Sequence, residues 1–150
     1  MLQMLRFYPD QVARHWDKIG YAIERALPPL VDSRKAEERM NEVLEAILAG
    51  RLDVFVYIDY EDEKPIVYAT ISVAVSLSAV GNNKELLLYS LFGHRAIGEK
   101  VMFEGFRLLM KYAKSVGCIA ISAYTNVEVM KTYAKGLSGA QDFTYIRFEI

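Results

Sequence analysis

Hydrophobic and polar residues along the chain follow two periods, and the switches between them divide the sequence into helices and strands. Residues 11–27 carry apolar side chains at steps of three and four, the spacing of one face of a helix. Residues 52–60 and 65–75 have the pattern of strands, and the link "EDEK" between them predicts a hairpin. The expected strands are 3–8, 52–60, 65–75, 85–92, 118–124 and 142–150, and the expected helices are 11–27, 33–49, about 97–116 and about 126–135.

Capping and turn residues set the expected ends of these elements. Pro9 ends the first strand, and Asp10 is the expected cap of the first helix. Asp32 or Ser33 is expected to cap the second helix, and Gly50 is well placed for a left-handed residue after its end.

The element order β-α-α-β-β-β-α-β-α-β predicts an α/β fold with a mixed sheet. Antiparallel hairpins come first, and the strand–helix–strand unit at 85–124 is expected to be a parallel crossover. The strand at 85–92 is apolar on both faces, which favours a central position, and the uncharged strand at 118–124 is expected to be buried. We expect a single domain over 1–150, with helices on both faces of the sheet.

Composition excludes several classes of function. The net charge is −1, so bulk charge gives no reason to expect nucleic acid or a membrane as a partner. The single cysteine, Cys118, cannot form an internal disulfide, and no signal-peptide pattern is seen, so a cytoplasmic location is expected. The two histidines, His15 and His94, lie far apart in sequence, and no metal site is expected.

The hexapeptide "GHRAIG", residues 93–98, joins a predicted strand to the long predicted helix and is the main candidate for a binding site. Amides at a helix N-terminus lack partners within the helix and favour a phosphate group. Gly93 and Gly98 permit close approach of the backbone, Arg95 supplies a charge, and His94 supplies a pH-dependent donor. A tight connection also favours glycine, so the hexapeptide alone leaves a plain connector as the other interpretation.

The segment "RAIGEKVMFEGFRLLMKYAKSVGCIAISAYTNVEVMKTYAKGL" resembles the acyl-CoA-binding core of the GNAT superfamily of N-acetyltransferases. The family pattern Gln/Arg-x-x-Gly-x-Gly/Ala is kept at Gly98, whereas Gly93 and Ala96 replace its first residue and its central glycine. Asn126 and Tyr133, seven residues apart, have a spacing that family members often show. The chain thus resembles a divergent member with a degenerate signature, and "LLLYSLFG" and "ISAYTN" are similar to GNAT-like proteins of tailed phages.

The resemblance implies that acetyl-CoA donates an acetyl group to a primary amine of a small molecule or a peptide. It implies that Tyr133 protonates the departing thiolate. The residues that it assigns to acetyl-CoA are Leu91, Phe92, Gly93, His94, Arg95, Ala96, Ile97, Gly98 and Asn126. Helix capping is the other interpretation of Asn126. The altered signature keeps a second function open, a GNAT-like interaction or structural module that has lost acyl-CoA binding and catalysis.

The sequence does not single out a general base. Residues expected on strands facing the gap between the two parallel strands are Glu85, Tyr89, Ser90, Ser122 and Tyr124, each with a structural role as its alternative. Three hairpin tyrosines, Tyr57, Tyr60 and Tyr68, are candidates to line an acceptor groove. The predicted last strand, 142–150, has the character of a sheet edge, which favours pairing with a second copy, so a homodimer is expected.

Overall fold

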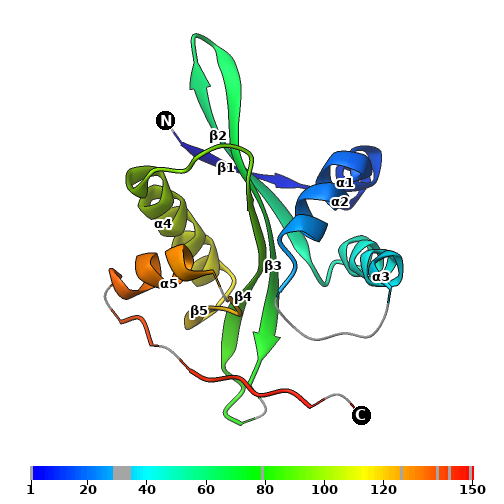
Figure 1. Cartoon of the computed structure of the whole chain (residues 1–150), viewed down its shortest axis with the longest axis vertical. Helices are drawn as coiled ribbons and strands as arrows, with labels where there is room; N and C mark the ends of the chain where they lie inside the picture. The colour runs from blue at the N-terminus through cyan, green and yellow to red at the C-terminus, as the bar shows by residue number, and fades with distance from the viewer. Residues whose placement is uncertain are drawn as a thin grey trace.

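The computed structural model describes residues 2–28, 35–78, 80–125, 127–137, 139–141, 143–148 and 150, and within them a five-stranded sheet lies between two groups of helices (Figure 1). The elements in chain order are β1 (Gln3–Phe7), α1 (Pro9–Arg14), α2 (Trp16–Arg25), α3 (Ala36–Leu48), β2 (Asp53–Glu61), β3 (Lys64–Leu77), β4 (Lys84–Gly93), α4 (Glu99–Ser115), β5 (Ala120–Ala123) and α5 (Glu128–Lys135).

The strands follow one another across the sheet in the order β1-β2-β3-β4-β5. The pairings β1–β2, β2–β3 and β3–β4 are antiparallel, and β4–β5 is parallel. Asp62 and Glu63 connect β2 to β3 with φ of 49° and 64°. Positive φ at both residues is typical of a two-residue hairpin turn that matches the right-handed twist of the two strands. The predicted hairpin, the parallel crossover through α4 and the interior position of β4 are confirmed.

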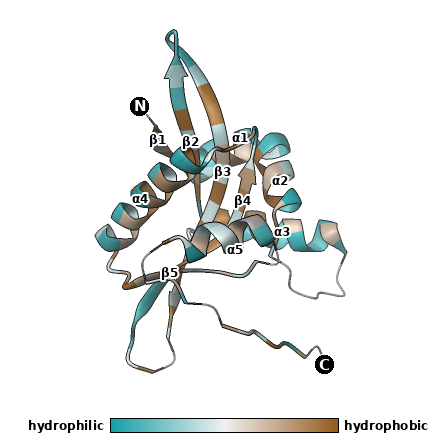
Figure 2. Ribbon diagram, turned by 60° about the vertical axis from the view of Figure 1, so that its left-hand side comes forward, coloured by the Kyte–Doolittle hydropathy of each residue, from teal (hydrophilic) through white to brown (hydrophobic). Residues whose placement is uncertain are grey.

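Helices cover both faces of the sheet: α4 and α5 lie on one side, and α1, α2 and α3 on the other (Figure 1). The buried core on the α4 side includes Phe55, Tyr57, Ile71, Leu86 and Leu109. The core on the α1–α3 side includes Val12, Ile23, Val43, Ile47 and Val54. The hydrophilic tip of the β2–β3 hairpin extends beyond both layers (Figure 2).

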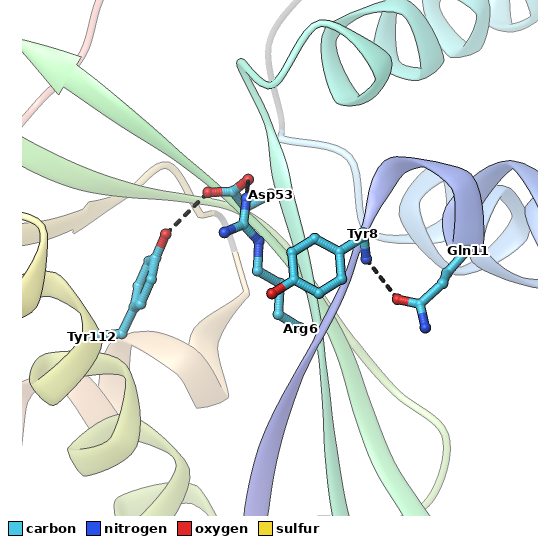
Figure 3. A network of polar contacts seen from close by, with 5 residues as sticks. All are labelled: Arg6, Tyr8, Gln11, Asp53 and Tyr112. Carbon is cyan, nitrogen blue, oxygen red and sulfur yellow. Dashed lines mark hydrogen bonds and ion pairs between the residues drawn. The ribbon is translucent and has the colours of Figure 1, made fainter.

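The start of the first helix differs from the prediction. The predicted helix 11–27 is two helices, α1 and α2, separated at His15, whose φ of −115° and ψ of 26° are not helical. Tyr8 is the N-cap, and Pro9 is the first helical residue because its fixed φ suits that position. The Tyr8 amide donates a hydrogen bond of 2.8 Å to Gln11 Oε1 (Figure 3), so the predicted cap Asp10 lies inside the first turn.

Two further capping predictions have different outcomes. Gly50 follows the end of α3 with φ of 75°, which confirms its predicted left-handed conformation. The N-cap of α3 is Lys35, and the predicted caps Asp32 and Ser33 lie outside the described residues.

The predicted last strand is wrong over residues 143–148, which belong to no strand. Phe143, Ile146 and Phe148 are 84%, 71% and 85% exposed. Alternating hydrophobicity determines which face a strand can bury, but a strand also needs a neighbour for its backbone groups. The expected homodimer stays a prediction.

The predicted burial of residues 118–124 is also only partly right. Cys118 is buried, but Ile119 is 69% exposed and the residues of β5 are half-buried or exposed. The reason is the position of β5, which lies at the end of the sheet order and pairs with β4 alone.

Helix α4 lies close against the sheet at Gly105. A Cβ atom at this position would lie 2.8 Å from Cε2 of Tyr57 on β2, which is shorter than van der Waals contact. The Tyr57 hydroxyl donates a hydrogen bond of 3.0 Å to the Gly105 carbonyl oxygen. Burial raises the pKa of Tyr57, so its phenol stays protonated as the donor.

A second contact holds the later part of α4 against the sheet (Figure 3). The Tyr112 hydroxyl donates a 3.0 Å hydrogen bond to Asp53 Oδ2, while Arg6 Nη2 lies 2.8 Å from Asp53 Oδ1. Burial first, and then the hydrogen bond to Asp53, raises the pKa of Tyr112 to about 12. This three-residue group therefore ties α4 to β1 and β2 with a protonated tyrosine.

We predict that Gly105→Ala lowers the free energy of unfolding. The added methyl group meets the Tyr57 ring, and overpacking of this kind costs about 1–3 kcal/mol. Urea unfolding followed by circular dichroism measures the change.

Gly136→Ala is the matched control, because Gly136 has a helical φ of −74° and its added Cβ would find no atom closer than 3.4 Å. We expect the free energy of unfolding of this variant to be unchanged or to rise by up to about 1 kcal/mol. Equal stability of the two variants would contradict the close approach of α4 to Tyr57.

Candidate functional site

The candidate site begins where β4 and β5 separate. Their parallel pairing runs from Glu85 with Ala120 to Leu88 with Ala123 and ends there. β4 continues to Gly93 beside β3, whereas the chain beyond β5 turns into α5. Residues 89–93 therefore present a backbone edge that β5 does not cover.

A bulge in β4 lies at this point. Ser90 pairs with Ser72 of β3 and Leu88 pairs with Val73, so Tyr89 is an additional residue in β4. The bulge changes which face later side chains occupy. Leu91 packs against the core on the α4 side, whereas the Phe92 ring lies edge-on to that of Tyr21 on α2.

The first half of the turn is anchored on the α2 side of the sheet. The His94 amide donates a 2.9 Å hydrogen bond to the Tyr68 carbonyl oxygen, and His94 Nε2 lies 2.7 Å from Thr70 Oγ1. Burial lowers the pKa of His94, so its imidazole is neutral at neutral pH. His94 consequently adds no full positive charge to the turn.

The second half of the turn lies on the α4 side. The Arg95 guanidinium is positioned over the Tyr68 ring, 5.6 Å from its centroid. Ile97 packs against the core on the α4 side, and Ala96 between them is exposed. The positive charge of Arg95 is thus held over Tyr68 of β3, and Arg95 precedes the N-cap of α4 by three residues.

The N-terminus of α4 has no side-chain cap. Gly98 is the N-cap residue, and no side chain makes the capping hydrogen bond there. The Met102 amide is bonded to the Gly98 carbonyl oxygen, so the amides before it have no acceptor within the helix. A Cβ on Gly98 would meet no atom within 4 Å, and its φ of −71° is open to any residue. Free amides, open space and Arg95 together suit a phosphate ester.

An apolar cavity of about 50 Å³ lies beneath the first turns of α4. Leu88 and Leu91 line it from β4, Val101 and Met102 from α4, and Met130 from α5. The cavity therefore begins beside the point where β4 and β5 separate and extends under the helix that carries the uncapped amides.

Tyr133 is half-buried on α5, and its ring lies edge-on to Phe103 of α4 with the centroids 6.5 Å apart. Met130, one turn earlier, lines the cavity, so both side chains are on the face of α5 that meets α4. The N-cap of α5 is Val127, and Asn126 lies outside the described residues.

The other predicted residues are spread over the molecule. Ser90 is buried and its hydroxyl contacts Ser72 Oγ on the α1–α3 side, away from Tyr133. Tyr124 is 42% exposed beside Tyr145, and Glu85 is at the opposite end of β4 from the turn.

Tyr57, Tyr60 and Tyr68 do not form one groove. Tyr57 is buried under α4, Tyr60 is exposed near the hairpin tip, and Tyr68 lies under Arg95. Tyr57 and Tyr68 both line the apolar cavity beneath α4 and Tyr60 does not, so the three predicted residues do not share one groove.

Sequence reasoning missed two parts of the site. The Thr70 side chain on β3 is hydrogen-bonded to the His94 side chain just after β4, and only the pairing of β3 with β4 brings the two residues together. Met130 was detectable, because it precedes Tyr133 by three residues and a helix places such pairs on one face.

The described part of the chain contains no group of three His, Cys, Asp or Glu side chains that could hold a metal ion. No helix there is long and apolar enough to cross a membrane.

Comparison of the sequence with protein-family models gives no match, and comparison with curated proteins gives none either. The structure, in contrast, superposes over nearly its full length on solved structures of acetyltransferases. A predicted acetyltransferase with acetyl-CoA from Clostridium acetobutylicum has a TM-score of 0.67 at 12% identity, covering 99% of this chain and 96% of that one.

Two further structures carry more specific names. Ribosomal-protein-alanine N-acetyltransferase from Brucella melitensis biovar Abortus 2308 has a TM-score of 0.67 at 8% identity, covering 100% and 99% of the two chains. Glucosamine-6-phosphate N-acetyltransferase from Arabidopsis thaliana has a TM-score of 0.58 at 18% identity, covering 99% of both. At these identities the likeness is one of fold: the chain has the fold of the GNAT superfamily of acetyltransferases.

Proposed function

We propose that this protein is an acetyl-CoA-dependent N-acetyltransferase whose acceptor is a primary amine. The observation that carries the proposal is the uncapped N-terminus of α4 at Gly98, directly after the uncovered backbone edge of β4. The pantetheine arm of acetyl-CoA is extended and polar and leads to phosphates, so it needs backbone groups along a strand edge and a cluster of free amides at a helix start.

The turn would hold the phosphates of the cofactor. The amides at the start of α4 donate to phosphate oxygens, and Arg95 adds a charged, forked donor. Gly98 leaves the space beside these amides open, and residues 91–93 offer backbone groups to the pantetheine arm. When bound, acetyl-CoA supplies an acetyl group activated as a thioester.

Tyr133 is the proposed acid. Its hydroxyl would donate a proton to the leaving sulfur, and the contact with Phe103 holds its ring on the inner face of α5. The role of a general base is not assigned to a side chain. Ser90, one candidate, is hydrogen-bonded to Ser72 on the other face of the sheet.

A non-catalytic GNAT-like module is the second candidate function. It is favoured by the exposed methyl group of Ala96 in place of the family's central glycine and by the neutral imidazole of His94. The two candidates differ in whether acetyl-CoA binds at all.

Thermal unfolding with acetyl-CoA separates them. We expect acetyl-CoA to raise the free energy of unfolding by about 2.7 kcal/mol when its concentration is a hundred times the dissociation constant.

Arg95→Ala should weaken the binding of acetyl-CoA at least tenfold, because it removes a charged hydrogen bond worth about 1.5–3 kcal/mol. Arg107→Ala, which removes the same charge from an exposed position later in α4, is the control and should stay within about twofold of the native affinity.

No stabilisation at millimolar acetyl-CoA would overturn the enzyme assignment and favour the module. Equal weakening by the two arginine variants would show that Arg95 acts through net charge and not through contact with phosphate.

Tyr133→Phe tests the proposed acid. The variant keeps the ring contact with Phe103 and removes only the hydroxyl, so turnover should fall by about 10² while acetyl-CoA affinity stays the same. Thiol release from acetyl-CoA measures turnover, with glucosamine 6-phosphate and an N-terminal alanine peptide as acceptors. These two acceptors are chosen from the names of the structural neighbours.

Tyr8→Phe is the matched control, since Tyr8 is exposed at the start of α1. It should keep full turnover. Full turnover in Tyr133→Phe would remove Tyr133 from the mechanism.

A further inference from the structure

The apolar cavity beneath α4 has no role in holding the phosphates. Leu88, at the last β4–β5 pair, and Met130, on α5, lie among its lining residues. Tyr57 also lines it, but the hydroxyl of Tyr57 is bonded to the Gly105 carbonyl oxygen and is not available to a guest. The cavity therefore offers a guest mainly carbon surface.

The size and lining of the cavity define its occupant. A water molecule needs about 10–15 Å³ of such space and two to four polar partners. The cavity of about 50 Å³ thus has room for roughly three to five groups of that size but few polar partners for water. A short hydrocarbon chain matches both properties.

The cavity lies beside the position proposed for the thioester. Met130 and Tyr133 are three residues apart on one face of α5, which corresponds to about 4.5 Å along the helix axis. If the Tyr133 hydroxyl reaches the sulfur, a group attached to the neighbouring carbonyl carbon is near Met130, which lines the cavity together with Leu88.

We propose that this cavity is an acyl-chain pocket and that the protein binds a saturated acyl-CoA of about four carbons in preference to acetyl-CoA. The proposal rests on the proposed function, because it assumes that the CoA portion binds at the start of α4. It adds the class of acyl group, which the turn and Tyr133 do not determine.

Isothermal titration with CoA, acetyl-CoA, butyryl-CoA and octanoyl-CoA tests the pocket without requiring an acceptor. Two additional methylene groups, each worth about 0.8 kcal/mol, should make butyryl-CoA bind roughly tenfold more tightly than acetyl-CoA. Octanoyl-CoA should gain nothing over butyryl-CoA, because its chain exceeds the cavity.

Met130→Phe should fill the cavity and remove the preference for butyryl-CoA over acetyl-CoA, while the affinity for CoA itself, which carries no acyl group, stays within about twofold of native. Met110→Phe is the matched control, since Met110 is exposed on α4 and does not line the cavity. It should keep the preference. Val101→Phe, on the α4 side of the cavity, repeats the test if Met130→Phe does not fold.

The outcomes distinguish the two proposals. Acetyl-CoA and butyryl-CoA binding equally well would overturn the acyl pocket and leave the proposed function intact. A tenfold preference that survives both cavity-filling variants would also overturn the pocket. Failure of CoA and of every acyl-CoA to bind would overturn the proposed function, and the pocket with it.

Discussion

The contact between Gly105 and Tyr57 fixes the distance between α4 and the sheet, and the proposed site depends on that distance. The helix backbone accepts a hydrogen bond from Tyr57 at a position where even a methyl group would not fit. A second hydrogen bond, from the Tyr112 hydroxyl to Asp53, joins the later part of α4 to β2. With these two contacts in place, the N-terminus of α4 lies next to the end of β4, and its free amides face open space at Gly98.

The separation of β4 from β5 gives the site its second half. Four residue pairs join the strands, and beyond Leu88 the sheet ends on one side of β4. The bulge at Tyr89 sends Leu91 to the α4 side and Phe92 to the α2 side. A ligand along this edge would therefore have the apolar cavity and Tyr133 on one side, and the buried Ser72–Ser90 pair on the other.

Most of the sheet and helix pattern was predictable because each element buries one periodic face. The break at His15 was not, since the apolar positions of residues 11–27 keep a helical period across it. The unformed last strand shows the same limit, because alternation does not specify a partner. The turn at 93–98 was identified from its place between strand and helix, but an additional residue at Tyr89 reverses the face of every side chain after it. That reversal cannot be seen without the pairing partner Ser72.

The proposed function depends on the first amides of α4 binding the phosphates of acetyl-CoA. The most direct measurement is a titration of ¹⁵N-labelled protein with acetyl-CoA, followed by amide chemical shifts. We expect the largest changes at Gly98, Glu99 and Lys100, with smaller ones along β4 at residues 91–93. Unchanged shifts at the start of α4, with changes confined to the α1–α3 side of the sheet, would contradict it.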